Sequence, residues 1–236
     1  REKIIKLAWY EARDTLLGQN NVNQDVKRGM ELAAACEHPE TRWLTELFAG
    51  KKVDTIEEAQ KVFLEQGEDD AKSLCFRALI LKTLPREPTQ FLRSAQLGFA
   101  LAQACIAQFP EYSIPFAEAS ARQGERDGFS ILGYYYEHYD GEWKEDLIKA
   151  KQNLLMAAEL GDVRAMSGYA CLLDESDPNR WHFWALAGSH VCSWNFLEEF
   201  PRHVEQLEAG IGDASVVFAI GQALKKHVNF EEREIL

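Results

Sequence analysis

Residues 128–165 read GFSILGYYYEHYDGEWKEDLIKAKQNLLMAAELGDVRA, and this stretch decides the fold. In its first half a small residue, a leucine, a glycine and a tyrosine stand at offsets 0, 4, 5 and 8, at Gly128, Leu132, Gly133 and Tyr136. At about 100° per residue these positions fall within about 140° of arc, which is one face of a helix. Its second half has apolar residues three and four apart, the spacing of another amphipathic helix. The stretch therefore predicts two helices that pack through these faces.

The glycines and aromatic residues of this stretch indicate packing rather than a ligand site. Glycine lowers helix propensity by about 1 kcal/mol relative to alanine, so Gly128 and Gly133 predict places where helices approach closely. Aromatic residues at helical spacing usually belong to a core. We expect Tyr136 to fill the seam between repeats and Trp143 to pack in the turn.

The same pattern returns along the chain at a nearly constant interval. The small first position recurs with spacings of 31, 32, 31, 26 and 37 residues, at Ala8, Pro39, Ala71, Ala102, Gly128 and Ala165. A weaker copy starts near Val216, and strand signals are almost absent. We predict an all-α fold, a right-handed α-solenoid of about 6–7 stacked helix-turn-helix repeats. It forms a single domain over 1–236, with the strongest repeat at 128–165 and a degenerate capping region at 196–236.

The strongest repeat resembles a Sel-one-like repeat (SLR), a relative of the tetratricopeptide repeat. In that family L-G-x-x-Y marks the first helix, and K-A followed by A-A-x-x-G marks the second. The matching residues here are Leu132, Gly133, Tyr136, Asp146, Lys149, Ala150, Ala157, Ala158 and Gly161. Other copies depart from the pattern, since Pro110 replaces the tyrosine and residues 177–200 fit no clear register. The resemblance implies an adaptor in a larger assembly.

The composition argues against two classes of partner. The 236 residues are 46% apolar and carry a formal net charge of -12, which repels nucleic-acid phosphates and anionic lipids. The longest apolar run, FALAQACIAQF, is much shorter than the roughly 20 residues that span a bilayer. We therefore expect no nucleic acid and no membrane as partner.

The number and spacing of the cysteines indicate the redox state of the protein's cellular compartment. There are five, an odd number, widely spaced and without a C-x-x-C pair: Cys36, Cys75, Cys105, Cys171 and Cys192. Each falls in an apolar or helical pattern, where free cysteine behaves as a small hydrophobic residue. This usage fits a reducing compartment and predicts a cytoplasmic protein. Because the chain starts at Arg1 rather than Met, we expect a fragment of a longer protein.

The candidate binding residues lie opposite the packing face of each first helix. Offsets 2, 3, 6 and 10 lie on that opposite arc, which lines the concave surface of stacked helix pairs. The predicted partner-binding stripe consists of Tyr10, Asp14, Arg42, Thr45, Arg77, Gln108, Tyr134, His138 and Ser167. Tyrosine and arginine often dominate binding energy at interfaces. The alternative is a polar face that contacts only water.

Catalytic signatures are absent from the sequence. It contains no nucleophile elbow, phosphate-binding glycine loop or zinc-protease helix, and its six histidines are scattered. We therefore predict no catalytic residue, metal or cofactor, and a non-enzymatic scaffold that binds a protein or peptide in its concave groove. The alternative is a regulatory or enzymatic subunit with a small-molecule pocket near residues 181–196, where Trp181, His182, His190 and Cys192 cluster.

Overall fold

The computed structural model describes residues 2–20, 22–66, 70–80, 88–138, 146–174, 176–177 and 180. These residues form eleven α-helices and no strand, which confirms the all-α prediction. The helices are α1 (Glu2–Leu17), α2 (Val26–Ala34), α3 (Pro39–Leu47), α4 (Ile56–Leu64), α5 (Ala71–Ile80), α6 (Thr89–Gln96), α7 (Ala100–Ile106), α8 (Ser113–Arg122), α9 (Arg126–His138), α10 (Leu147–Glu159) and α11 (Val163–Leu172). The predicted capping region 196–236 lies outside the described residues.

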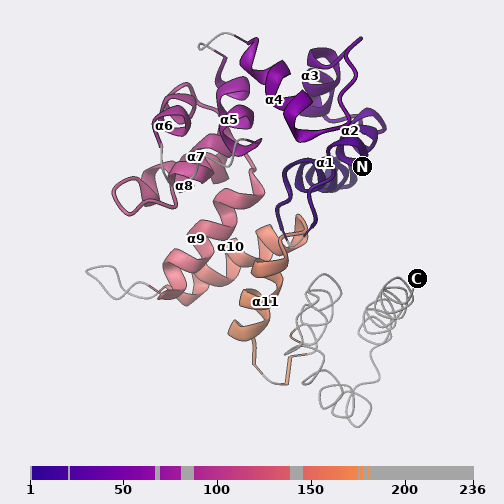
Figure 1. The fold of residues 1–236 in the computed structure, drawn as a ribbon. Coiled ribbons are helices and arrows are strands. Elements are labelled where there is room, and N and C mark those ends of the chain that lie inside the picture. The colour runs from indigo at the N-terminus through magenta and orange to yellow at the C-terminus, as the bar shows by residue number, and fades with distance from the viewer. Residues whose placement is uncertain are drawn as a thin grey trace.

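Successive helices pack as a solenoid. Most helices contact the next in the chain, and α9 also contacts α7 and α11 across the repeats. In Figure 1 the array curves from α1 through α5 and α7 toward α11, so that α1 lies on the inner side of the curve. The helix pair α9 and α10 corresponds to the repeat at 128–165, with α9 as its first helix.

Short sequence signals set the helix ends. Thr55 and Glu58 form a capping box at the start of α4, and Asp146 and Asp162 accept hydrogen bonds from the first turns of α10 and α11. Gly161 ends α10 with φ of +87°, a left-handed conformation that glycine adopts without a side-chain clash. The turns between repeats are therefore encoded locally.

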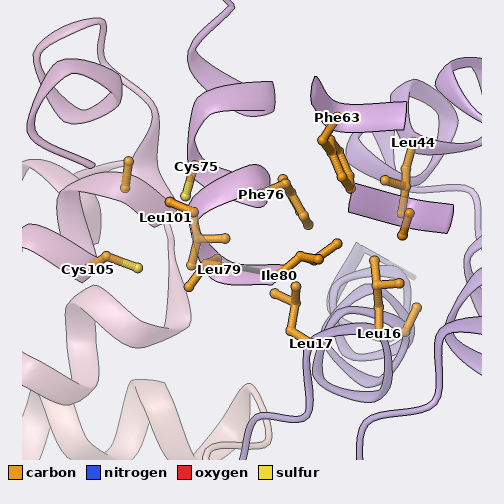
Figure 2. Close-up of a cluster of buried hydrophobic side chains, with 14 of the residues drawn as sticks. Leu16, Leu17, Leu44, Phe63, Cys75, Phe76, Leu79, Ile80, Leu101 and Cys105 are labelled. Carbon is orange, nitrogen blue, oxygen red and sulfur yellow. The ribbon is translucent and has the colours of Figure 1, made fainter. Parts of the chain in front are cut away.

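The largest core of the described residues joins helices α1 to α7, and Figure 2 shows part of it around α5. On one side of α5, Phe76 and Ile80 point toward Leu16 and Phe63. Phe63 and Phe76 are stacked with ring centroids 5.9 Å apart. Cys75 and Leu79 project to the other side, toward Leu101 and Cys105 of α7. Because α5 is buried on both sides, it ties the early repeats into one core.

The close helix crossing predicted at Gly133 is confirmed. A Cβ atom on Gly133 would lie 2.5 Å from Cγ of Leu154 in α10. A Cβ atom on Gly128 would lie 2.6 Å from the Ser120 hydroxyl oxygen in α8. Tyr136 is half-buried and packs against a cluster from α7, α8 and α9, as expected for a residue in the seam. Trp143 lies outside the described residues.

Candidate functional site

A groove of about 490 Å³ opens on the inner side of the array, and its walls come from α9, the start of α11, and the turns that follow α1 and α7. We call it the inner groove; its lining is Gln19, Asn20, Gln108, Arg126, Asp127, Ser130, Ile131, Tyr134, Asp162 and Arg164. Two residues of the predicted stripe, Gln108 and Tyr134, lie in it. Ser130, Ile131 and Tyr134 occupy offsets 2, 3 and 6 of their repeat, so the groove follows the predicted concave arc.

Arg164 of α11 and Tyr134 of α9 form one wall of the groove. The Arg164 guanidinium lies 5.4 Å from the centroid of the Tyr134 ring, and the Tyr134 hydroxyl donates to the backbone oxygen of Arg164. Burial raises the pKa of Tyr134 to about 12, and the charge of Asp162 adds to the effect. The tyrosine therefore stays protonated at neutral pH and holds α9 to α11.

Three side chains with hydrogen-bond acceptors, Gln19, Asp127 and Asp162, also line the groove. Asp162 caps α11 by accepting from the Ala165 backbone N–H at 2.8 Å. Burial raises the pKa of Asp162 above its ordinary value, although the Arg126 charge and the capping hydrogen bond act in the opposite direction. Oε1 of Gln19 is buried and accepts no hydrogen bond from any described residue. We call the part of the lining formed by Gln19, Asp127 and Asp162 the acceptor end.

Behind the acceptor end lies a buried ion cluster that connects α1 to the turn between α8 and α9. Its members are Arg13, Asp14, Glu125, Arg126 and Asp127. Arg13 donates to Glu125 at 2.8 Å and to both oxygens of Asp127 at 3.0 Å. Arg126 donates to the two oxygens of Asp14 at 2.7 and 2.8 Å and to Asp127 at 3.0 Å. The cluster joins residues that are more than 110 positions apart in the chain.

Tyr10 and Asn20 complete this long-range contact. Both guanidinium groups lie over the Tyr10 ring, that of Arg13 at 4.7 Å and that of Arg126 at 4.6 Å from the ring centroid. Its hydroxyl accepts from the Arg126 backbone N–H and donates to the Gly124 carbonyl. The Asn20 side chain donates to the Gly161 carbonyl at 2.8 Å and accepts from the Val163 N–H at 3.0 Å. The first repeat is thus fixed to two later inter-repeat turns.

The charges of the cluster determine the protonation states of its members. Burial alone would raise the pKa of Asp127, but the guanidinium groups of Arg13 and Arg126 keep this pKa below its usual range. Burial raises the pKa of Tyr10 well above its ordinary value, with the charge of Glu125 adding to the effect. At neutral pH Asp127 is therefore ionised and Tyr10 is neutral.

Two residues of the predicted stripe are not on the surface. Tyr10 is 4% exposed and Asp14 is 3% exposed, because the curvature brings their face of α1 against the α8–α9 turn. The expectation that these two side chains line an open groove is therefore corrected. They stabilise contact between the first repeat and the later ones.

The other stripe residues are spread along the array. Arg42 is exposed and pairs with Glu46 at 2.9 Å, while the Thr45 hydroxyl donates to the Arg42 carbonyl. Arg77 is half-buried and donates to Gln90 at 3.4 Å. Ser167 is half-buried, and its hydroxyl donates to the Arg164 carbonyl. His138 is the last residue of α9. As a binding surface, the stripe stays a prediction.

Sequence reasoning missed Asp127 and Arg164, although a signal for them was present. Each stands one position before the small first residue of its repeat, Gly128 or Ala165. At about 100° per residue, offset -1 lies on the same helical face as offsets 3 and 6. Extending the stripe back by one turn would have included both residues.

A second hollow, of about 650 Å³, lies between α1 and the α10–α11 turn. It also contacts Asn20 and Arg126, but much of its remaining lining is apolar and includes the exposed side chains of Ile4, Leu7 and Val22. It has few free polar groups that could orient a ligand, in contrast to the inner groove.

The described part of the chain offers little for metal binding or catalysis. Its His, Cys, Asp and Glu side chains form no group of three or more that could hold a metal ion. Burial raises the pKa of Cys75 well above its ordinary value, which keeps this thiol unreactive. No helix within the described ranges has the length and apolar character needed to cross a membrane. The alternative pocket at 181–196 lies outside the described residues.

Comparisons with known proteins agree with this architecture. No protein-family model matches the chain, and no curated protein matches it. Among solved structures, the chain is similar to a protective antigen of uropathogenic Escherichia coli strains that displays an SLR fold. The TM-score is 0.54 at 14% sequence identity, over 92% of this chain and 52% of the antigen, so the chain spans about half of that structure. At this identity the likeness concerns the fold: the chain is an all-α solenoid similar to SLR-fold proteins.

Proposed function

We propose that the chain is a non-enzymatic interaction scaffold that binds an extended segment of a partner protein in the inner groove. One observation carries the proposal: the groove spans three successive repeats, from Gln108 in the turn after α7, through Ile131 and Tyr134 of α9, to Arg164 of α11. A continuous surface of this kind suits a chain segment that runs across several repeats.

The chemistry of the groove suits main-chain recognition. Gln108 and Arg164 are exposed, and each side chain can hydrogen-bond to the peptide groups of an extended segment. The half-buried Tyr134 and Ile131 provide apolar surface between them. Rigid aromatic and arginine side chains at a groove are typical contributors to interface affinity.

The arrangement of carboxylates in the groove favours binding over catalysis. Asp127 is held by two guanidinium groups, and Asp162 is occupied as a helix cap. A nucleophile within hydrogen-bond reach of a general base would support an enzyme. The described groove residues contain no Cys or His for that role.

The experiment is a selection of peptides from a random library on the purified protein, followed by titration of the selected peptides. We expect Arg164→Ala and Gln108→Ala each to weaken binding by about 1–3 kcal/mol, the range of interface hot spots. Arg122→Ala is the matched control, because Arg122 is an exposed arginine of α8 with a 71% exposed side chain that lies outside the groove. Equal affinities for all three variants and the wild type, or no selected peptide, would contradict the proposal.

A further inference from the structure

The second hollow, between α1 and the α10–α11 turn, is bordered by exposed apolar side chains. Ile4, Leu7 and Val22 line it and are 71%, 37% and 38% exposed. Leu160 and Met166, which also line it, are buried and apolar. Single exposed apolar side chains are common on protein surfaces. Three of them around one hollow of about 650 Å³ indicate a surface that binds another molecule.

The polar side chains that line this hollow have partners, with one exception. Arg126 and Asp14 form an ion pair at 2.7 Å. Three other polar side chains donate to backbone carbonyls: those of Tyr10, Thr15 and Asn20. Glu11 is exposed, and its carboxylate forms no ion pair or hydrogen bond with any residue that the structure describes. The hollow therefore offers a partner apolar contact and one free negative charge.

This combination suits a helix better than an extended segment. An extended segment has backbone N–H and C=O groups that need partners, and the lining offers no free hydrogen-bonding side chain except that of Glu11. A helix satisfies its backbone groups internally. Ile4, Leu7 and Glu11 stand at i, i+3 and i+7 of α1, and so they share one face. A helix that lies along α1 can contact all three with residues at the same spacing.

The size and charge of the surface argue against a second copy of the chain as the occupant. A stable dimer buries about 800 Å² on each partner, and three partly exposed side chains supply much less. Two copies with a formal net charge of -12 each also repel one another. A short helix of a basic partner needs less area and is attracted to the chain.

We propose that this hollow binds a short amphipathic helix of a partner protein. Its apolar side chains pack on Ile4 and Leu7, and a lysine or arginine on its flank pairs with Glu11. Burial of the apolar side chains supplies most of the affinity, and the ion pair adds a smaller part. This inference goes beyond the proposed function and stands without it, because none of these three residues lines the inner groove.

The test is a selection from a displayed library of helical peptides with randomised surface positions. Peptides are selected on the purified wild-type chain and counter-selected on Ile4→Asn. We expect the retained peptides to have apolar residues at i, i+3 or i+4 and i+7, together with lysine or arginine. Ile4→Asn should weaken their binding about tenfold or more, because the burial of one isoleucine side chain is lost. Glu11→Lys should weaken it about threefold or more.

Three measurements serve as controls. Leu64→Asn should bind the peptides like the wild type, because Leu64 is a 56% exposed apolar residue of α4 outside the hollow. Arg164→Ala, in the inner groove, should also leave the affinity unchanged. Ile4→Asn should change Tm by less than about 2 °C, since Ile4 is 71% exposed.

Four results would overturn the inference. The first is that no peptide prefers the wild type to Ile4→Asn, and the second is that the retained peptides lack the apolar spacing or the basic residue. The third is a dimer, detected by light scattering, that Ile4→Asn abolishes, since a second copy would then occupy the hollow. The fourth is a fall in Tm of more than about 5 °C in Ile4→Asn, which would mean that the chain itself covers this side chain.

Discussion

Replacing Arg126 by methionine tests how strongly the ion cluster holds the first repeat against the later ones. Arg126 is 3% exposed, and its three guanidinium nitrogens donate to Asp14 and Asp127 at 2.7 to 3.0 Å. Methionine has a similar unbranched length, so packing against Tyr10 is largely kept. The cluster would then contain one cation, Arg13, and three carboxylates.

The excess of buried carboxylates over cations determines how much stability Arg126→Met should lose. Removing one partner of a buried ion pair typically costs about 3–5 kcal/mol, because the remaining charge stays desolvated. We therefore expect Arg126→Met to lower the free energy of unfolding by about 3–5 kcal/mol. Arg122→Met is the control, since Arg122 is 71% exposed and pairs with Glu118 at 3.7 Å; exposed pairs of this kind contribute about 0–1 kcal/mol.

The assay is urea unfolding followed by far-ultraviolet circular dichroism, together with hydrogen exchange of the native protein. Because Arg126 fixes α1 to the α8–α9 turn, Arg126→Met should increase exchange in both α1 and α9. A loss within about 1 kcal/mol of the Arg122→Met value would refute the reasoning, because exposed pairs reach that magnitude. So would a loss of protection confined to α9.

Three further predictions concern single positions. Gly133→Leu should destabilise the protein by about 1–3 kcal/mol through overpacking against Leu154, and an added Leu154→Ala change should recover part of the loss in urea melts. Burial and nearby lysines lower the pKa of His38, so its contribution to stability is present above about pH 6.5 and is lost as pH falls below that value. His38→Asn, which keeps a helix cap, should therefore reduce the fall in Tm between pH 7.5 and 5.5 measured by calorimetry; an unchanged fall would contradict this. Asp162→Asn should raise Tm at pH 7, since the folded state disfavours the charge on Asp162, and a lowered Tm would show that the carboxylate is well compensated.

Much of the fold could be predicted because its determinants are local. The small residues and the 3.6-residue spacing predict a close helix crossing at Gly133, and in the structure this glycine lies against Leu154 of the paired helix. The opposite arc predicts a concave face with Gln108 and Tyr134, and both residues line the inner groove. Each of these inferences needs only the geometry of a helix and of its immediate neighbour.

The role of α1 could not be predicted in this way. The pattern puts Tyr10 and Asp14 on the concave face, but whether that face is open depends on the rotation accumulated over several repeats. Here the curvature is tight enough to bring this face onto Arg126. Periodicity within one repeat carries no information on the total rotation over several repeats. The adjacent charged residues Arg13 and Asp14, in a part of α1 that is mostly buried, did indicate a polar contact at this face.

The most direct test of the account is a map of amide chemical shifts in the wild-type protein, titrated with the tightest peptide from the random library. The account predicts that the largest shifts fall at Gln108, along Ser130 to Tyr134, and at Asp162 to Arg164, which together line the inner groove. Largest shifts on exposed positions outside the groove, such as Arg122 and Gln152, would contradict it.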